Sequence, residues 1–338
     1  MKLKFAFLFL FSVLFLSVYS FAQKPVLKWS EEEDEKTSFT PNVLGFNDNY
    51  YFVKENNSKI LRFKVYDYNG KLISSTDINK TYNGDKLGLV NSLNFHDKYV
   101  IILGRADKSK NIFSYYYLVI KDGKINGEIK ELCSLTHTHK SFGFVDSFNQ
   151  DYEGVRLSRD ENSVIIVRSS YNKESSGLNE KFIVLRINEQ FEIEYQKDIE
   201  LDHIDDDFIV EDVEFNFSGK PIILGKKKKA KEEFKAEKKE NKAKKMEKGS
   251  KEKVTRSDFY IYAEKNGTFV GKKIELEEKS ILRKSVLYPL SDGKMIMTGF
   301  YTEADSEYWG FHGTYFMKLD SDATIIKKSI NKFSDEIL

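Results

Sequence analysis

The feature that most constrains this chain is a repeated pair of apolar segments, separated by a polar or aromatic loop and flanked by turns. The pattern is clearest in Met295–Leu319, and the same form occurs four more times upstream. A first kind of turn precedes five apolar runs: YYFVKE, YVIILG, SVIIVR, PIILGK and MIMTGF. A repeat of this kind predicts an array of similar structural units.

A second kind of turn follows the second apolar run of each unit. Three of these turns are Asn69-Gly70, Asp122-Gly123 and Asn266-Gly267. Such dipeptides supply the positive φ angles of tight hairpins, so the flanking strands pair antiparallel. The glycine is missing at Glu189-Gln190 and Asp322-Ala323, where we expect a longer loop.

A strand before the first turn and a more polar strand after the second complete a unit of four strands. The units recur about every fifty residues, which fits propeller blades better than a sandwich. We therefore predict an all-β fold, a β-propeller of four-stranded antiparallel blades, with extra chain around Cys133–Glu153. Five blades are visible, at 37–78, 86–132, 139–199, 204–276 and 280–330.

The two ends do not match a simple ring of five blades. Lys24–Glu31 resembles an outer strand without a blade, and the final FSDEIL resembles the start of a sixth blade. Either five blades close the ring and leave a frayed tail, or the chain is an incomplete or shortened version of a larger ring. We favour the second interpretation.

The first residues have the pattern of a signal peptide. Lys2 and Lys4 precede an apolar run, and Ser20-Phe21-Ala22 provides the small residues of a cleavage site before Gln23. The alternative is a retained membrane anchor, for which the run is short. We expect residues 1–22 to be removed and 23–338 to be exported to the periplasm, the cell surface or the outside, with no membrane span.

A lysine-rich insertion at 226–253 interrupts the fourth blade between its two middle strands. It contains fourteen Lys and six Glu, a net charge of +8, whereas the whole chain carries +1. Its composition favours a solvated helical arm or a helix-biased loop. The arm either contacts an anionic surface or is a tolerated surface insertion. Nucleic acid is not an expected partner, because an exported location offers little of it and Phe234 is the arm's single aromatic residue.

Two groups of residues suggest chemistry but lack its full pattern. His137 and His139, with Cys133 upstream, are weak metal candidates because no second pair completes a tetrahedral set. The acids Asp205–Asp207 and Asp146 would serve a glycan hydrolase only if two carboxylates lay several ångströms apart. A solvated acidic loop is the alternative. We expect no cofactor and no metal.

The aromatic loop within Met295–Leu319 is the best candidate for binding. Tyr308, Trp309 and Phe311 are interleaved with glycine in an inter-strand loop, where exposed rings would stack on sugars or anchor a protein. An apolar cap over the end of the fifth blade is the alternative interpretation.

The signal peptide, the repeated Asn-Gly and Asp-Gly turns and the segment Gly310–Phe316 (GFHGTYF) give the chain a family resemblance. It resembles uncharacterised exported β-propeller-like proteins of Gram-negative bacteria. The resemblance covers most of 37–330 and implies an architecture but no catalytic residues. The function we expect is non-enzymatic binding or scaffolding, with an envelope or extracellular protein or a glycan as partner. The alternative is an extracellular glycan hydrolase with carboxylates near the propeller channel.

Overall fold

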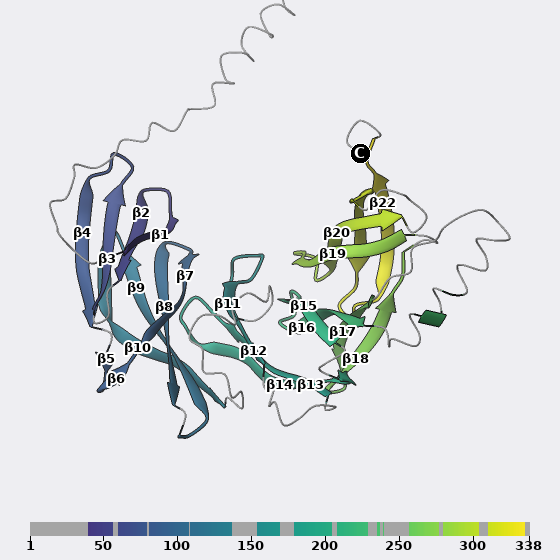
Figure 1. Ribbon diagram of the computed structural model, residues 1–338, viewed down its shortest axis with the longest axis horizontal. Coiled ribbons are helices and arrows are strands. Elements are labelled where there is room, and N and C mark those ends of the chain that lie inside the picture. The colour runs from purple at the N-terminus through teal and green to yellow at the C-terminus, as the bar shows by residue number, and fades with distance from the viewer. Residues whose placement is uncertain are drawn as a thin grey trace, which may run out of the picture. The chain divides into compact units, whose positions relative to one another are not determined.

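A computed structural model of the chain is shown in Figure 1. It describes residues 40–56, 60–79, 81–107, 109–136, 154–169, 179–204, 208–228, 235–236, 239, 257–276, 280–303 and 310–334. The expected signal peptide, the strand-like Lys24–Glu31 and the final four residues lie outside these ranges. The closure of the ring and the expected export therefore stay predictions.

The described chain forms five sheets, each of four antiparallel strands, which confirms the predicted all-β fold with blades of the propeller type. It divides into two compact units, 1–78 and 79–338. The first unit holds the first sheet: β1 (Thr40–Phe46), β2 (Tyr50–Asn56), β3 (Ile60–Asp67) and β4 (Leu72–Asn79).

The second unit holds the other four sheets (Figure 1). The strands of the second and third sheets are β7 (Gly88–Phe95), β8 (Lys98–Asp107), β9 (Ile112–Lys121) and β10 (Lys124–Thr136), then β11 (Gly154–Leu157), β12 (Val164–Ser169), β13 (Asn179–Ile187) and β14 (Ile193–Ile204). Those of the fourth and fifth are β15 (Phe208–Phe215), β16 (Pro221–Lys228), β17 (Ser257–Lys265) and β18 (Thr268–Ile274), then β19 (Ser280–Pro289), β20 (Met295–Glu303), β21 (Gly313–Leu319) and β22 (Ile325–Lys332). A small extra hairpin, β5 (Thr81–Tyr82) and β6 (Asp85–Lys86), precedes the second sheet.

The tight turns have the backbone conformation that the sequence predicts. Asp122 and Gly123 have φ angles of 50° and 73°, and Asn266 and Gly267 have 51° and 83°. Two consecutive positive φ angles are those of a type I′ hairpin, whose twist matches the strands on either side.

The longer loops expected at Glu189-Gln190 and Asp322-Ala323 are confirmed, because five residues separate the strands at 188–192 and at 320–324, against two at 122–123 and at 266–267. These turns have the same hydrogen bond as the glycine-containing turns, in which the fourth residue's N–H donates to the first residue's carbonyl. Phe191 (φ 64°) and Ala323 (φ 55°) take the positive-φ position that Gly70, Gly219 and Gly293 take elsewhere. The side chains of Asn188 and Asp320 each accept a backbone N–H two residues on, which stabilises the turn without a glycine.

Consecutive sheets of the second unit pack face to face around three apolar cores. One core joins the second and third sheets, another the third and fourth, and the last the fourth and fifth. The first strands of neighbouring sheets lie close together, as β7 and β11 do, and β15 and β19. The sheets therefore hold one another by apolar burial.

Some predicted boundaries need correction. The second sheet extends to Thr136, so Cys133 is a buried strand residue and not part of an insertion. Burial raises the pKa of its thiol to about 12. Lys226, Lys227 and Lys228 lie in β16, and the connection to β17 spans 229–256. Within that connection the described residues 235, 236 and 239 are helical.

Candidate functional site

The connections within each sheet alternate between the two ends of its strands, because the four strands run antiparallel in sequence order. We use the name loop edge for the side of the sheet where the first strand begins. The side where the first strand ends is called the turn edge. In residues 79–338, the turn edge has short connections, of which 158–163 is the longest. The loop edge has the connections 108–111, 137–153, 170–178, 205–207, 229–256, 275–279 and 304–312, four of which are longer than any at the turn edge. Long connections between rigid strands are where binding residues concentrate.

The candidate residues of the sequence analysis all fall in loop-edge connections. The aromatic candidates lie in 304–312, the paired histidines and Asp146 in 137–153, the acidic triplet in 205–207, and most of the lysine-rich arm in 229–256. Phe311 is the one aromatic candidate that the structure describes. The candidates outside the described residues, whose roles stay predictions, are Tyr308, Trp309, His137, His139, Asp146 and Asp205–Asp207.

Phe311 forms an exposed aromatic group at the loop edge of the fifth sheet. It is 46% exposed and stacks on Phe300 of β20, with ring centroids 4.7 Å apart and planes 26° apart. Phe300 is 38% exposed, and the ring of Phe333, just after β22, has its centroid 6.5 Å away. Rings that served only as a cap would be buried. This degree of exposure leaves aromatic surface for a partner.

The residue after Phe311 fixes the base of this loop. His312 is buried, and its Nδ1 lies 2.9 Å from the Thr302 hydroxyl. Because that hydroxyl donates its proton to the Gly310 carbonyl, it accepts from His312, whose Nδ1 therefore carries a proton. The backbone N–H of His312 donates to the Tyr301 carbonyl. The aromatic group thus stands on a hydrogen-bonded base.

His203 near the end of β14 is the most unusual histidine of the described residues. Its ring stacks on Phe208 with centroids 4.8 Å apart and meets Tyr260 edge to face at 4.9 Å. Its Nε2 is buried and has no hydrogen-bond partner among the described residues. Burial lowers the pKa of the imidazole against the weaker opposing effect of Asp202. His203 therefore packs as a neutral ring among aromatics.

The ranges that the structure describes contain neither a cluster of metal ligands nor a membrane-spanning helix. Those ranges contain no group of three or more His, Cys, Asp or Glu side chains placed to hold a metal ion. They also contain no helix long and apolar enough to cross a membrane.

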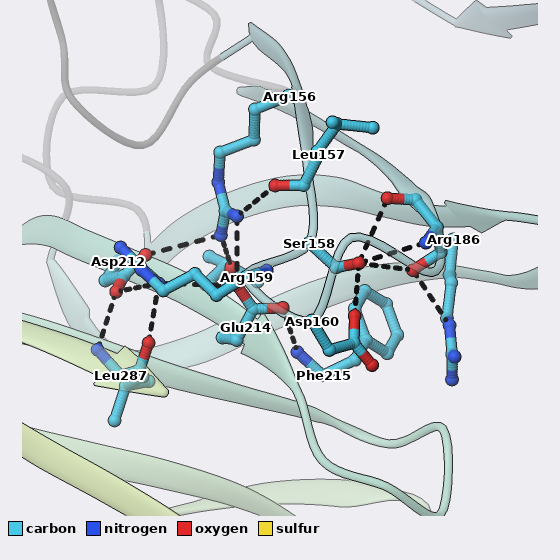
Figure 2. A network of polar contacts seen from close by, with 12 residues as sticks. Arg156, Leu157, Ser158, Arg159, Asp160, Arg186, Asp212, Glu214, Phe215 and Leu287 are labelled. Carbon is cyan, nitrogen blue, oxygen red and sulfur yellow. Dashed lines mark hydrogen bonds and ion pairs between the residues drawn. The ribbon is translucent and has the colours of Figure 1, made fainter. Parts of the chain in front are cut away.

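A group of charged residues that the sequence analysis did not predict joins the third, fourth and fifth sheets (Figure 2). Arg156 Nη1 lies 3.0 Å from Glu214 Oε2, and Arg156 Nη2 lies 3.3 Å from Asp212 Oδ1. Arg159 Nη1 lies 2.7 Å from Asp212 Oδ2 and donates to the Leu287 carbonyl at 2.7 Å. We call Arg156, Arg159, Asp212 and Glu214 the ion cluster.

Backbone groups complete the ion cluster. Leu287 N–H of β19 donates to Asp212 Oδ2 at 2.8 Å, and Phe215 N–H donates to Glu214 Oε1 at 3.0 Å. Glu214 is fully buried and Asp212 is 3% exposed. Two carboxylates that each accept from arginine and from backbone are held in place and are poorly suited to general acid or base catalysis. The contacts of the ion cluster therefore indicate a structural link between blades.

The ion cluster gives a pH prediction. Burial raises the pKa of Glu214 above its ordinary 4.5, outweighing the opposing effect of Arg156. At pH values between 4.5 and the raised pKa of the folded state, Glu214 binds a proton more readily in the folded protein than in the unfolded chain. The stabilisation from Glu214 is therefore fully present below 4.5 and falls as pH rises through that window. We compare wild type with Glu214→Gln by urea unfolding at pH 4.5 and at pH 7. The unfolding free energy of wild type should exceed that of the variant by more at pH 4.5 than at pH 7. An excess that grows with pH contradicts this prediction.

The sequence does contain a signal for the ion cluster. Asp212 and Glu214 lie at two-residue spacing in the strand FIVEDVEF, which also contains Glu211, and this spacing places the two on one face. Charged residues are seldom fully buried unless they are paired. Two acids at such positions therefore imply cationic partners elsewhere, but the sequence does not show that these are Arg156 and Arg159.

Comparisons with known proteins give a distant likeness in fold. No family model matches the sequence, and no curated protein matches it. Among solved structures, a puromycin hydrolase is 9% identical with a TM-score of 0.41, covering 88% of this chain but 39% of that one. An α-L-arabinanase of Penicillium chrysogenum is 8% identical with a TM-score of 0.36, covering 87% and 93%. A subtype N11 neuraminidase-like protein of an A/flat-faced bat (H18N11) strain is 11% identical with a TM-score of 0.35, covering 85% and 70%.

The chain thus spans well under half of the puromycin hydrolase. Some of these similar structures are named as glycan-degrading enzymes, but at such low identity and TM-score the likenesses carry no argument about function. The resemblance to exported Gram-negative proteins stays a prediction.

Proposed function

We propose that this chain is an exported, non-enzymatic binding protein that contacts its partner through the loop edge of its blades. The observation that carries the proposal is the exposed stack of Phe300 and Phe311, held on the buried pair of Thr302 and His312. A rigidly based, half-exposed aromatic group supplies contact area at low entropic cost. Tyr308 and Trp309 belong to the same connection by sequence.

The charged residues of the ion cluster fit a structural role. The buried acids of the ion cluster are engaged by arginine and backbone donors, so neither is poised to move a proton. The hydrolase hypothesis rests on Asp146 and Asp205–Asp207, which lie outside the described residues. No observation in the described part favours it.

Export gives a separate prediction. If residues 1–22 are removed during export, the mature protein begins at Gln23. We expect amino-terminal sequencing and intact mass of the protein recovered outside the cytoplasm to show this start. Recovery of a chain that still begins at Met1 contradicts the export step and leaves the binding surface to be judged on its own.

The binding proposal is tested by capture from the envelope and secreted fractions of the producing cell. The baits are the mature protein, Phe311→Ser, a deletion of 229–256 and Val270→Ser. Val270 is a matched control because it is 45% exposed but lies in β18, away from the aromatic group. We expect Phe311→Ser to lose most of the captured partner, Val270→Ser to keep it, and the deletion to show whether the lysine-rich arm contributes. Equal capture by Phe311→Ser and wild type contradicts the proposal.

A further inference from the structure

His203, near the end of β14, lies where the third sheet packs on the fourth. Its side chain is 10% exposed and lies among Phe208, which begins β15, and Tyr260 and Tyr262 of β17. The Tyr262 ring has its centroid 6.0 Å from that of the imidazole and meets it edge to face. Phe208 and Tyr262 belong to the apolar core that joins the two sheets. A polar ring of one sheet is thus placed among aromatic rings of the next.

Two of these aromatic rings have no room to withdraw from His203. A Cβ added at Gly225 would lie 2.2 Å from the Phe208 ring, and one added at Gly271 would lie 2.5 Å from the Tyr262 ring. Each ring therefore packs directly on the backbone of a glycine in its own sheet. If His203 no longer fits among the rings, the end of β14 has to move rather than the fourth sheet.

A neutral imidazole suits this position better than a charged one. Nε2 is buried and has no hydrogen-bond partner among the described residues. In the charged ring both nitrogens are donors, so Nε2 would carry an N–H with Asp202 Oδ1 4.0 Å away, beyond hydrogen-bond distance. A buried donor without an acceptor costs free energy, and an unpaired buried charge costs more.

The charged groups around His203 do not compensate for this burial. On its own strand, Asp202 favours the charged ring, but it is 72% exposed and its Oδ1 already accepts from the Tyr262 hydroxyl at 2.8 Å. On β16, Lys227 opposes a second positive charge. On β17, the hydroxyls of Tyr260 and Tyr262 carry no charge near neutral pH, and β15 contributes an apolar ring. Burial has the largest effect and lowers the pKa of His203 below its ordinary 6.5.

We propose that His203 is a pH-sensitive latch between the third and fourth sheets, closed when the imidazole is neutral and released when it is protonated. In the closed state the ring stacks on Phe208. In the released state the imidazolium turns towards water and the Asp202 carboxylate, and the end of β14 leaves the fourth sheet. Histidine is the side chain whose charge ordinarily changes between pH 5 and 8. The latch goes beyond the proposed binding function, and neither depends on the other.

The direction of the pH dependence follows from where the proton binds more readily. The pKa of His203 is lower in the closed state than in the released or unfolded chain, so protons favour release. The stabilisation from the latch is therefore fully present above 6.5 and is lost as pH falls from 6.5 through the lowered pKa. Glu214 contributes in the opposite direction, so wild type has to be compared at each pH with a variant that keeps Glu214.

Hydrogen exchange of the mature protein at pH 7.5 and pH 5, corrected for the intrinsic rates, tests the latch. The variant His203→Phe keeps an aromatic ring that cannot be charged. In wild type, we expect the amides of residues 201–204 to lose at least about threefold in protection at pH 5, relative to β12. His203→Phe should show no such loss and should be the better protected of the two at pH 5. His203→Gln is a second uncharged variant, with the same expected result if the phenylalanine does not fit.

An NMR titration measures His203 itself, with its signal identified by its absence from His203→Phe. A pKa below 6.5 supports the latch. A pKa above 6.5 overturns it, because the aromatic faces or Asp202 then hold the charged ring in place. The inference is also overturned if wild type loses no protection at residues 201–204, or if the uncharged variants lose as much as wild type.

Discussion

Glu214→Ala is expected to lower the free energy of unfolding by roughly 3–5 kcal/mol, because it leaves two arginines facing Asp212 alone in a buried site. The lost contacts are those of Oε2 with the Arg156 guanidinium at 3.0 Å, the Arg159 guanidinium at 3.3 Å and the Arg159 N–H at 3.2 Å, and of Oε1 with Phe215 N–H. Urea unfolding at pH 7 measures the change.

The matched control replaces all four charges of the ion cluster with apolar side chains of similar size. Such a replacement removes the desolvation penalty together with the attraction, so it should cost far less than the single change and is expected to be near neutral. A Glu214→Ala loss below about 1 kcal/mol, or a fourfold variant that is the less stable of the two, shows that the ion cluster does not hold the sheets together.

Gly299→Ala in β20 is expected to cost roughly 3 kcal/mol or more, measured by thermal or urea unfolding. An added Cβ would lie 1.8 Å from the Lys284 carbonyl oxygen, a backbone atom that cannot move alone. Lys284 follows a β-bulge in β19, and the bulged strand presses against the glycine.

Gly267→Ala is the control for this prediction. A Cβ there meets nothing within 4 Å, and the cost comes from its φ of 83°, which amounts to about 1–2 kcal/mol. If both variants lose the same stability, the close approach at Gly299 is not what requires glycine.

Local chemistry explains why the blades were predictable. A turn such as Asn266-Gly267 restricts its own backbone, and strands on both sides alternate by rules of short range. Five four-stranded units follow from such turns without knowledge of distant contacts. Even so, Phe191 shows a limit, because it adopts positive φ where its ring also stacks on Tyr117 with centroids 4.0 Å apart.

The glycines opposite β-bulges were harder to interpret. Gly104, Gly225 and Gly299 end the runs YVIILG, IILG and MTG of three repeats, and each lies near the bulge of its neighbouring first strand. An added Cβ at Gly225 would lie 2.2 Å from the Phe208 ring. The recurrence is visible in the sequence, but its cause is a contact between strands.

The candidate site was predictable only in part. Phe311 was predicted as a binding residue because glycine-punctuated aromatics in a loop indicate binding, and its binding role stays a proposal. The ion cluster was missed because Arg156 and Asp212 are 56 residues apart and meet only when two sheets pack. Its role depends on burial, which a single sequence does not report.

A binding role for the loop edge is tested by the dissociation constant of the captured partner, measured by calorimetry for wild type, Phe311→Ser and Val270→Ser. A binding role for the loop edge predicts at least about tenfold weaker binding for Phe311→Ser. It also predicts unchanged binding for Val270→Ser and unchanged unfolding free energy for both variants. Equal dissociation constants for all three proteins would contradict the account.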